Sequence, residues 1–185
     1  MRLSNKAMLA PDELNRRLAQ VKLLLTDVDG VMTDGAVYIG EQGEMKRFDI
    51  QDGLGLHMLQ RCGIRVGWIS KRPSPVTQRR ARELKIDFVS QDHGGKVPAA
   101  RTILASTGLR FDQVCYVGDD LVDLALLRAV GAAVAVPNAV SEVKVVAHYI
   151  THSAGGKGAI RELADLILKA QNKWTTVVES YESES

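Results

Sequence analysis

The chain has 185 residues, of which 45% are hydrophobic and 25% are charged, and these values are typical of one globular domain rather than a disordered segment. The formal net charge is only +2, from 24 basic and 22 acidic residues, and this balance gives no reason to expect a nucleic-acid partner. No run approaches the roughly 20 apolar residues of a membrane span, and residues 1–14 are too polar for a signal peptide, so we expect a cytoplasmic protein without a membrane partner.

Segments with the character of strands and helices alternate along the chain. An amphipathic helix is expected at 11–18, where Leu14 and Leu18 lie four residues apart. Apolar runs predict strands buried on both faces of a sheet, and these runs are 23–25, 65–70, 86–90, 113–118, 132–136 and a short last run at 148–151. Helical spacing predicts helices between the strands, at about 53–62, 73–84, 96–107, 121–130 and 159–170. Two extended segments, 36–39 and 44–48, flank a glycine-containing turn and predict a β-hairpin.

This alternation predicts an α/β fold with a doubly wound, Rossmann-like parallel sheet. We expect an N-terminal helical extension at 1–20 and a main domain at 21–172 that carries the hairpin within 36–48. The last segment, 173–185, is polar, and we expect it to be a mobile tail.

The first strand ends in two acidic residues, Asp27 and Asp29, which lie on one short loop followed by glycine. In open α/β sheets, ligands bind at the carboxyl ends of the strands. Two carboxylates on one loop repel each other unless a cation or a proton compensates them, and oxygen ligands suit Mg²⁺. A solvated acidic turn explains the same residues, because Asp and Gly are common in turns.

Polar residues also follow three later strands. Ser70 ends one strand, Lys96 follows the loop after the next, and an acidic cluster follows the third. That cluster consists of Asp119, Asp120 and Asp123. If the strands are neighbours, these side chains converge on one crevice. The combination suits phosphoryl transfer, which needs a nucleophile, a metal site and donors for the phosphoryl oxygens.

Four motifs therefore stand in a fixed order along the chain. They are Asp27-Val28-Asp29-Gly30-Val31, Ser70, Lys96 and Gly118-Asp119-Asp120-Leu121-Val122-Asp123. Each motif is weak alone, but the ordered set at strand ends resembles the haloacid dehalogenase (HAD) superfamily of phosphohydrolases. The resemblance implies a HAD-type fold and hydrolysis of phosphate monoesters through an aspartyl-phosphate intermediate.

The resemblance also implies a role for each residue at the strand ends. Asp27 would be the nucleophile, and Asp29 would be the general acid for the leaving alcohol and then the base for water. Ser70 would hydrogen-bond the phosphoryl group, and Lys96 would neutralise that group and orient Asp27. These roles make chemical sense, because one carboxylate stays ionised beside a metal while its neighbour can hold a proton near neutral pH.

Magnesium is the cofactor that the resemblance implies. Asp27, Asp119 and the backbone carbonyl of Asp29 would bind the ion. Asp120 and Asp123 would support the ion and Lys96 without being its principal ligands.

The intervals between the motifs leave no room for a cap domain. Residues 30–69 and 71–95 hold only the hairpin, helices and strands already described. The chain therefore resembles the capless branch of the superfamily. Without a lid, another element must exclude water and recognise the leaving group. The resemblance to the capless branch implies that the hairpin and a neighbouring subunit do so.

The hairpin and the segments near it narrow the resemblance further. The residues concerned are Asp34-Gly35, Tyr38, Gly43-Glu44, Lys46, Phe48, Asp52-Gly53-Leu54-Gly55, Arg72, Arg79-Arg80-Ala81, Gln91 and 155–162. In these positions the chain resembles the 3-deoxy-D-manno-octulosonate 8-phosphate phosphatases, and the match extends over about 21–170. The resemblance implies an acidic sugar phosphate as substrate, in the synthesis of lipopolysaccharide precursors. It also implies a homotetramer with active sites near subunit interfaces, in which the hairpins form a small central barrel.

The same resemblance implies a set of substrate-binding residues. By position they are Asp29, Asp49, Ile50, Gln51, Asp52, Gly53, His57, Arg72, Arg80 and Lys96. Arginine suits an acidic sugar phosphate, because its planar fork binds carboxylates or phosphates bidentately.

Three features depart from that family's pattern. Lys71 stands where glycine is usual, Gly95 belongs to an altered loop before Lys96, and His57 replaces an arginine or lysine. The catalytic set is intact, but a second substrate stays open. The alternative is a phosphatase of a nine-carbon 2-keto-3-deoxy sugar acid 9-phosphate.

A function of another class is a non-catalytic phosphoacceptor or regulatory domain. A receiver domain also places acids, a hydroxyl and a lysine around Mg²⁺ on a parallel sheet. It carries its acceptor aspartate after the third strand, whereas here the D-x-D motif follows the first strand and the second acidic cluster comes late. This order favours the enzyme.

The remaining polar features have simpler interpretations. Cys62 and Cys115 lie among apolar residues without metal-ligand spacing, so we expect both in the core. The histidines without ligand spacing are expected to be structural or solvated, and they are His93, His148 and His152. Gly155-Gly156-Lys157 does not complete a phosphate-loop pattern, and we expect it to be a flexible loop that reaches an active site.

Overall fold

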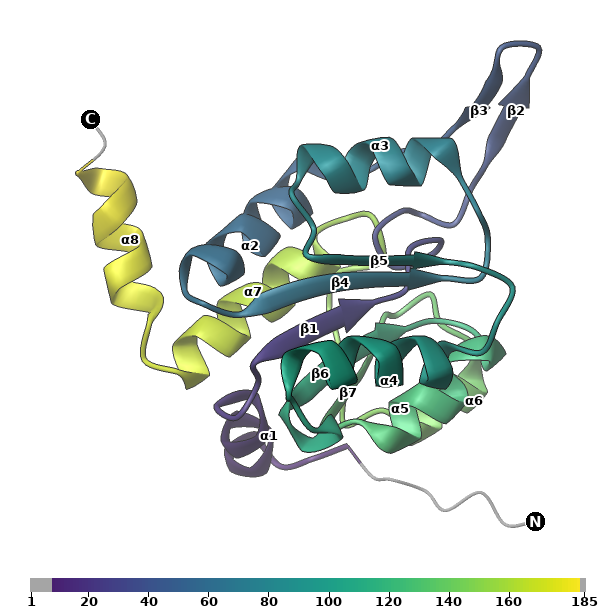
Figure 1. Ribbon diagram of the computed structural model, residues 1–185. Coiled ribbons are helices and arrows are strands. Elements are labelled where there is room, and N and C mark those ends of the chain that lie inside the picture. Colours follow the sequence, from purple (N-terminus) through teal and green to yellow (C-terminus); the bar gives the residue numbers. More distant parts are fainter. Residues whose placement is uncertain (1–7, 184–185) are drawn as a thin grey trace, which may run out of the picture.

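The apolar run that begins at Leu23 forms the central strand of a parallel sheet. The computed structural model describes residues 8–183, and within them six strands run parallel in one sheet (Figure 1). In spatial order they are β5 (Phe88–Gln91), β4 (Arg65–Ser70), β1 (Leu23–Thr26), β6 (Val114–Gly118), β7 (Ala132–Ala135) and β8 (Tyr149–Ile150). The chain builds outwards from β1 to β5 and then returns to β6 on the other side of β1. The predicted doubly wound fold is confirmed.

Helices cover both faces of this sheet (Figure 1). On one face lie α1 (Pro11–Leu18), α2 (Ile50–Arg61), α3 (Pro75–Glu83) and α7 (Ala159–Ala170). On the other face lie α4 (Lys96–Thr107), α5 (Leu124–Ala129) and α6 (Ser141–Val146). The apolar side of each long helix is turned towards the sheet, so that α7 buries Ile160, Leu163 and Ile167.

The core lies between these layers and holds the strands rigidly. Leu23, Leu24 and Leu25 are all fully buried, because β1 is covered on both faces. In the sheet register, Leu25 lies opposite Gly67 of β4 and Tyr116 of β6. Because β4, β1 and β6 are adjacent, the residues that follow them are brought to one edge of the sheet.

The predicted hairpin is present but shorter than expected. It consists of β2 (Tyr38–Gly40) and β3 (Gly43–Met45), which pair with each other and not with the main sheet (Figure 1). Residues 46–48, predicted as strand, instead run back to the body, where Phe48 pairs with Thr33. The apolar residues Tyr38, Ile39 and Met45 are exposed, and Ile39 is 84% exposed.

The last part of the chain differs from the prediction. Where a mobile tail was expected at 173–185, the structure has helix α8 (Trp174–Glu182). It forms because Trp174 and Val177 pack against apolar residues of the body. Residues 184–185, and residues 1–7 of the predicted N-terminal extension, lie outside the described part.

Smaller differences concern single elements. Helix α6 was not predicted, and the helix expected at 121–130 begins as a 3-10 turn at Leu121–Asp123 before α5. Within residues 8–183, no helix is long and apolar enough to cross a bilayer. Cys115 is buried as expected, whereas Cys62 is only partly buried.

Candidate active site

The carboxyl ends of β1, β4 and β6 open into one cavity of about 230 Å³. Its lining brings together most of the residues that the four motifs predict. The lining residues are Asp27, Asp29, Ser70, Lys71, Arg72, Lys96, Asp119, Asp120 and Val122. Two larger hollows formed by residues 8–183 each have only two charged side chains in their lining, Arg161 and Glu182 in one and Asp87 and Asp92 in the other. The predicted convergence of four distant segments is therefore what the structure has.

Asp27 lies at the floor of this cavity and is bound on both oxygens. Its Oδ2 is 2.7 Å from the Lys96 Nζ, and its Oδ1 accepts a hydrogen bond of 2.7 Å from the backbone N–H of Val28. Burial raises the pKa of Asp27 from 3.8 to about 6, because the nearby ammonium only partly offsets the loss of water and the charge of Asp123. A further cation at this carboxylate would therefore be strongly favoured.

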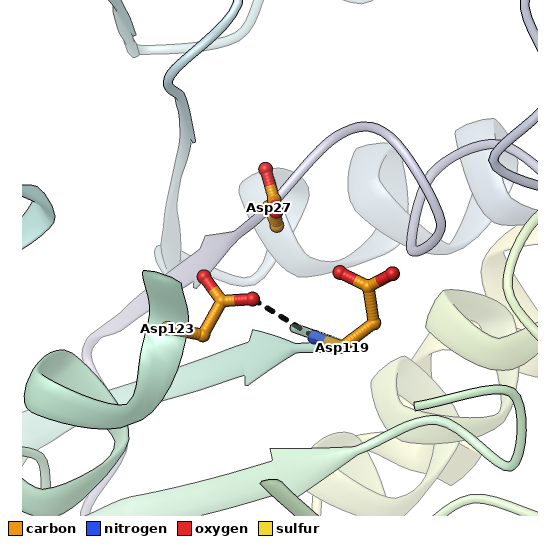
Figure 2. Close-up of side chains that lie close together, drawn as sticks. All are labelled: Asp27, Asp119 and Asp123. Carbon is orange, nitrogen blue, oxygen red and sulfur yellow. Dashed lines mark hydrogen bonds between the residues drawn. The ribbon is translucent and has the colours of Figure 1, made fainter. Parts of the chain in front are cut away.

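Asp123 holds the other cavity groups in place from below. Its Oδ1 accepts hydrogen bonds of 2.5 Å from Lys96 Nζ and from the Tyr116 hydroxyl. Its Oδ2 accepts a hydrogen bond of 2.9 Å from the backbone N–H of Asp119 (Figure 2) and one of 3.1 Å from the backbone N–H of Asp120. Both oxygens of this fully buried carboxylate are thus engaged. Asp123 therefore orients Lys96, Tyr116 and the backbone after β6 through both of its oxygens.

Asp119 offers the free oxygen that Asp123 lacks. Its Oδ1 is buried without a hydrogen-bond partner within residues 8–183, and burial raises its pKa from 3.8 to about 7, helped by the charges of Asp27 and Asp123. Gly30, which has a φ of +91°, leaves space for the Asp119 side chain, because a Cβ at position 30 would lie 2.0 Å from Asp119 Oδ2. A buried oxygen without a hydrogen-bond partner, beside a second carboxylate, raises the free energy of the folded protein, and a bound cation lowers it again.

The three acids Asp27, Asp119 and Asp123 each present an oxygen within 4.8 Å of the other two (Figure 2). All of the donor atoms are carboxylate oxygens, which suit a hard cation such as Mg²⁺. The residues therefore fit a magnesium ion held chiefly by Asp27 and Asp119.

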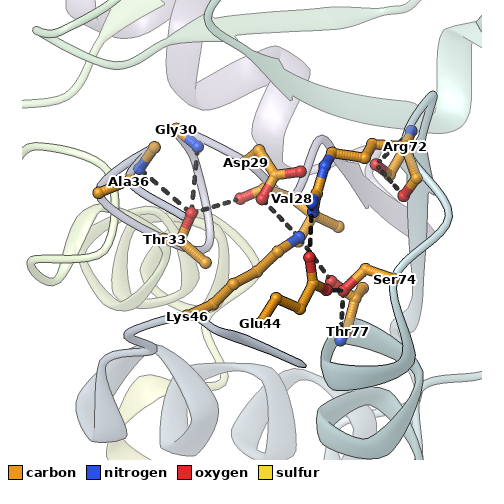
Figure 3. A network of polar contacts seen from close by, with 12 residues as sticks. Val28, Asp29, Gly30, Thr33, Ala36, Glu44, Lys46, Arg72, Ser74 and Thr77 are labelled. Atoms are coloured by element: carbon orange, nitrogen blue, oxygen red, sulfur yellow. Dashed lines mark hydrogen bonds and ion pairs between the residues drawn. The ribbon is translucent and has the colours of Figure 1, made fainter. Parts of the chain in front are cut away.

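Asp29 and Ser70 complete the cavity on the side of the hairpin. The Oδ1 of Asp29 is 2.6 Å from the Nζ of Lys46, which follows β3 (Figure 3). The Ser70 hydroxyl is buried and accepts a hydrogen bond of 3.1 Å from the backbone N–H of Arg72. The Arg72 guanidinium reaches the Glu44 carboxylate at 2.5 Å.

The other predicted substrate-binding residues do not line the cavity. Asp52 is fully buried and accepts the backbone N–H of Arg161 at 2.8 Å, so that it caps α7. Asp49 caps α2, and Gly53 lies against Arg80. The remaining members lie on α2, and they are Ile50, Gln51 and His57. Their assignment stays a prediction without support from this cavity.

Three residues near the site were given no role there in the sequence analysis. Lys46 contacts Asp29, and Tyr116 donates to Asp123 from inside a buried strand. Asn138, in the loop after β7, donates to the Gly30 carbonyl and accepts from Gly155 N–H, both at 2.8 Å. Its place after a strand was a usable signal, because the same rule identified the other loops.

The Gly155-Gly156 segment does not extend away from the body. It packs on the loop that follows the acid pair, where the Gly156 N–H donates to the Val31 carbonyl at 2.9 Å. A Cβ at Gly155 would lie 1.8 Å from the Gly30 oxygen, so the approach requires glycine. The expected loop thus lies beside the acid pair of its own chain.

A doubly wound sheet with an acid pair after its first strand, a lysine and a later acidic cluster defines a class of hydrolase. A sequence profile of the haloacid dehalogenase-like hydrolases matches residues 75–163. The 3-deoxy-D-manno-octulosonate 8-phosphate phosphatase of Yersinia pestis is 42% identical over 163 residues, which are 88% of this chain and 87% of that protein. The Haemophilus influenzae protein of the same name is 38% identical and matches 86% of this chain and 89% of its own length.

Solved structures agree with these relatives. The phosphatase of the same name from Moraxella catarrhalis, crystallised with magnesium, phosphate and KDO, is 37% identical with a TM-score of 0.90. That match covers 93% of this chain and 99% of the crystallised one. The chain belongs to the haloacid dehalogenase-like hydrolases and, within them, to the family of 3-deoxy-D-manno-octulosonate 8-phosphate phosphatases.

Proposed function

We propose that the protein is a Mg²⁺-dependent phosphatase that converts 3-deoxy-D-manno-octulosonate 8-phosphate into 3-deoxy-D-manno-octulosonate and phosphate. One observation carries the chemistry. The buried carboxylate of Asp27 is paired with Lys96 at 2.7 Å and lies beside the orphaned oxygen of Asp119. The choice of substrate is supported by the 3-deoxy-D-manno-octulosonate 8-phosphate phosphatases described above, which are 38% and 42% identical to this chain over 86% and 88% of its length.

In the reaction that we propose, Asp27 attacks the phosphorus atom of the ester. The bond between phosphorus and the ester oxygen breaks, and the leaving oxygen takes the proton of Asp29. Water then attacks the aspartyl-phosphate, gives its proton to Asp29 and releases phosphate and the Asp27 carboxylate. Lys96 compensates the phosphoryl charge, and the Ser70 hydroxyl with nearby backbone N–H groups binds the phosphoryl oxygens.

Magnesium would be held by the carboxylates of Asp27 and Asp119, with the backbone carbonyl of Asp29. Asp123 and Asp120 would support these ligands, since Asp123 already binds the backbone N–H groups of both neighbouring acids. When bound, the ion neutralises the charge of the phosphoryl oxygens.

Recognition of the acidic sugar falls to the cations at the mouth of the cavity. Arg72 and Lys71 line it, and Arg72 has a planar fork suited to a carboxylate. The predicted residues at 49–53, with His57 and Arg80, lie outside this cavity, so their contribution to binding requires the site to be completed from elsewhere.

A homotetramer would complete the site in that way. The hairpin exposes Tyr38, Ile39 and Met45, and such a group of apolar side chains is typical of a protein–protein interface. We propose that the hairpins assemble four subunits, with active sites near their interfaces. Ile39→Asp should convert the assembly into smaller species in sedimentation experiments, whereas an unchanged sedimentation coefficient would contradict this interface.

We place the protein in the cytoplasm. Cys62 and Cys115 are both free thiols, which is usual in a reducing compartment. Fractionation of cells should recover the protein with cytoplasmic markers.

Phosphate release from a panel of esters tests the function most simply. The panel contains the octulosonate 8-phosphate, a nonulosonate 9-phosphate and a neutral hexose phosphate, each with Mg²⁺. The octulosonate ester should have the highest kcat/KM, by at least about tenfold, which corresponds to about 1.4 kcal/mol. A preference for the nine-carbon ester would overturn the substrate, and no turnover of any ester would overturn the enzyme.

A further inference from the structure

The hairpin is joined to the active site through a buried lysine. Glu44 and Lys46 are two residues apart in extended chain and point to the same side. Glu44 accepts hydrogen bonds from Arg72 and from the Ser74 hydroxyl, while Lys46 reaches Asp29 (Figure 3). The exposed apolar residues Tyr38, Ile39 and Met45 lie on both strands of the hairpin, whereas Glu44 and Lys46 join β3 and the residue that follows it to the cavity.

The environment of Lys46 differs from that of an ordinary surface lysine. Its side chain is 0% exposed, and its Nζ lies 2.6 Å from Asp29 Oδ1 and 3.0 Å from the Thr77 hydroxyl. Burying an ammonium is costly unless a charged partner compensates it. The Asp29 carboxylate is that partner, so the position of the lysine and the position of the acid depend on each other.

Asp29 in turn depends on Lys46 for its orientation. Its Oδ1 is buried, and within residues 8–183 the Lys46 ammonium is the polar group that compensates it. The loop around it is held by other contacts, such as those of the Thr33 hydroxyl with Gly30 and Val28, but these do not involve the Asp29 side chain. A carboxyl group that exchanges a proton must keep its oxygen within hydrogen-bond reach of the reacting atom.

We propose that Lys46 is the positioning residue for the proton transfers of Asp29, and that the hairpin acts on catalysis through it. The inference rests on the proposed phosphatase function. In both steps the proton moves between Asp29 and the leaving oxygen or water, and the Lys46 ammonium keeps its protons. The two acids of the motif thus have separate lysines, since Lys96 pairs with Asp27 and Lys46 with Asp29.

The dependence of the rate on the leaving group separates this role from a merely structural one. A phenol of high acidity leaves without a proton, whereas a sugar alcohol needs one. Lys46→Met should therefore lower kcat/KM on the octulosonate ester by about 10- to 100-fold, at or below the lower end of the roughly 100- to 10,000-fold that general acid–base catalysis contributes, because Asp29 itself is kept. On 4-nitrophenyl phosphate the same variant should lose less than about threefold.

Two matched variants make the test specific. Lys46→Arg keeps a cation and should recover part of the activity on the sugar ester. Thr77→Val removes the other contact of Lys46 without touching Asp29, and it should keep the wild-type ratio between the two substrates. Thermal unfolding of each variant is measured first, and Lys46→Gln replaces Lys46→Met if the latter is unfolded.

The outcomes for the inference and for the function are distinct. Equal losses on both esters in Lys46→Met, or no loss on either, would overturn the role of Lys46. If the wild-type enzyme does not hydrolyse the octulosonate ester, the proposed substrate is wrong, but the role of Lys46 stays testable. The losses in kcat/KM would then be compared between 4-nitrophenyl phosphate and whichever alkyl ester of the panel is hydrolysed. Failure of every alkyl ester would overturn both.

Discussion

The carboxyl edge of the sheet and the β2–β3 hairpin contribute to the cavity in different ways. At the sheet edge, Asp27, Lys96 and Asp123 are buried and joined by contacts of 2.5–2.7 Å. The hairpin is exposed along both strands, and Glu44 and Lys46 link it to the cavity (Figure 3). The edge is a rigid floor that can carry the bond-breaking chemistry, whereas the hairpin is a wall that can adjust recognition and proton transfer.

This difference explains how an enzyme without a cap can combine a fixed reaction with a selective substrate. The floor groups follow directly from strands in the core, so their geometry is set by packing of the whole domain. The wall belongs to a separate two-stranded element, whose changes leave the core intact. Variants of the floor should therefore affect every substrate, and variants of the wall should affect substrates unequally.

The largest effect is expected from Asp27→Asn. Turnover of every ester should fall at least about 1,000-fold, because an amide is not a nucleophile towards phosphorus. The fold should be retained, and metal-free protein should unfold at the same or a higher temperature, because the buried acid that it replaces has a raised pKa. Wild-type turnover in this variant would remove Asp27 as the nucleophile.

The next effect is expected from Asp119→Asn. The Mg²⁺ concentration for half-maximal rate should rise at least about 100-fold, since even groups beyond the metal ligands contribute 10–100-fold to affinity. The matched control is Asp120→Asn, whose side chain is more exposed and already caps Leu121. An equal effect of the two variants would contradict the principal role of Asp119.

Arg72→Ala, which removes the partner of Glu44 in the wall, should discriminate between substrates. The KM for the acidic sugar ester should rise about tenfold, with a smaller change for 4-nitrophenyl phosphate. Because Arg72 also binds Glu44, the double variant with Glu44→Gln separates loss of the cation from release of an unpaired acid. Equal losses on both substrates would make Arg72 part of the phosphate site and weaken the distinction between floor and wall.

The pH dependence of stability without metal should report on the floor. Burial raises the pKa of Asp119 to about 7 and of Asp27 to about 6, both above the ordinary value of 3.8. Their contribution to stability is present below about pH 4 and is lost as the pH rises through 6 to 7. Asp52, whose pKa is raised to about 6 by burial, acts in the same direction.

Metal-free protein should therefore have a Tm a few degrees higher at pH 5 than at pH 8, since 1 kcal/mol shifts a domain of this size by about 2–4 °C. Adding Mg²⁺ at pH 8 should restore the lost stability. Asp119→Asn should reduce the difference in Tm between pH 5 and pH 8, and the part of that difference that is due to Asp52 should remain. An unchanged difference between the two pH values in that variant would contradict the shifted pKa.

The smallest effect is expected from Asn138→Ala. The change leaves the Gly30 carbonyl and the Gly155 N–H without their partner, at a cost of about 1–3 kcal/mol in unfolding free energy. Denaturant unfolding measures this loss, and Ser141→Ala on the exposed start of α6 should change stability by less than about 0.5 kcal/mol. Equal stability of the two variants would show that the bridge is not needed.

The floor could be predicted from the sequence because its groups stand at the end of an apolar run or in the segment that directly follows one. Leu23 to Leu25 are followed at once by the acids, and the same change of character marks Ser70 and Asp119. The parallel sheet then brings these positions together without further information. The hairpin was also recognisable from its two extended segments, although its strands are shorter than expected.

The rest depends on contacts between distant segments. Asp52 caps α7 through Arg161, 109 residues away, and nothing local distinguishes a capping acid from a ligand. Lys46 resembles a surface lysine until the hairpin folds back on Asp29. Helix α8 forms in a segment with a polar end, because Trp174 and Val177 find apolar partners on the body.

The most direct test of the account is detection of phosphate covalently bound to Asp27. Enzyme in excess is mixed with the octulosonate ester and Mg²⁺, stopped with acid within a single turnover, digested and analysed by mass spectrometry. If Asp27 is the nucleophile, one phosphoryl group accumulates on Asp27 before phosphate is released. It is absent from Asp27→Asn, and it persists longer where Asp29 is replaced by Asn. A phosphoryl group on another residue, or complete turnover without any labelled peptide, would contradict this role of Asp27.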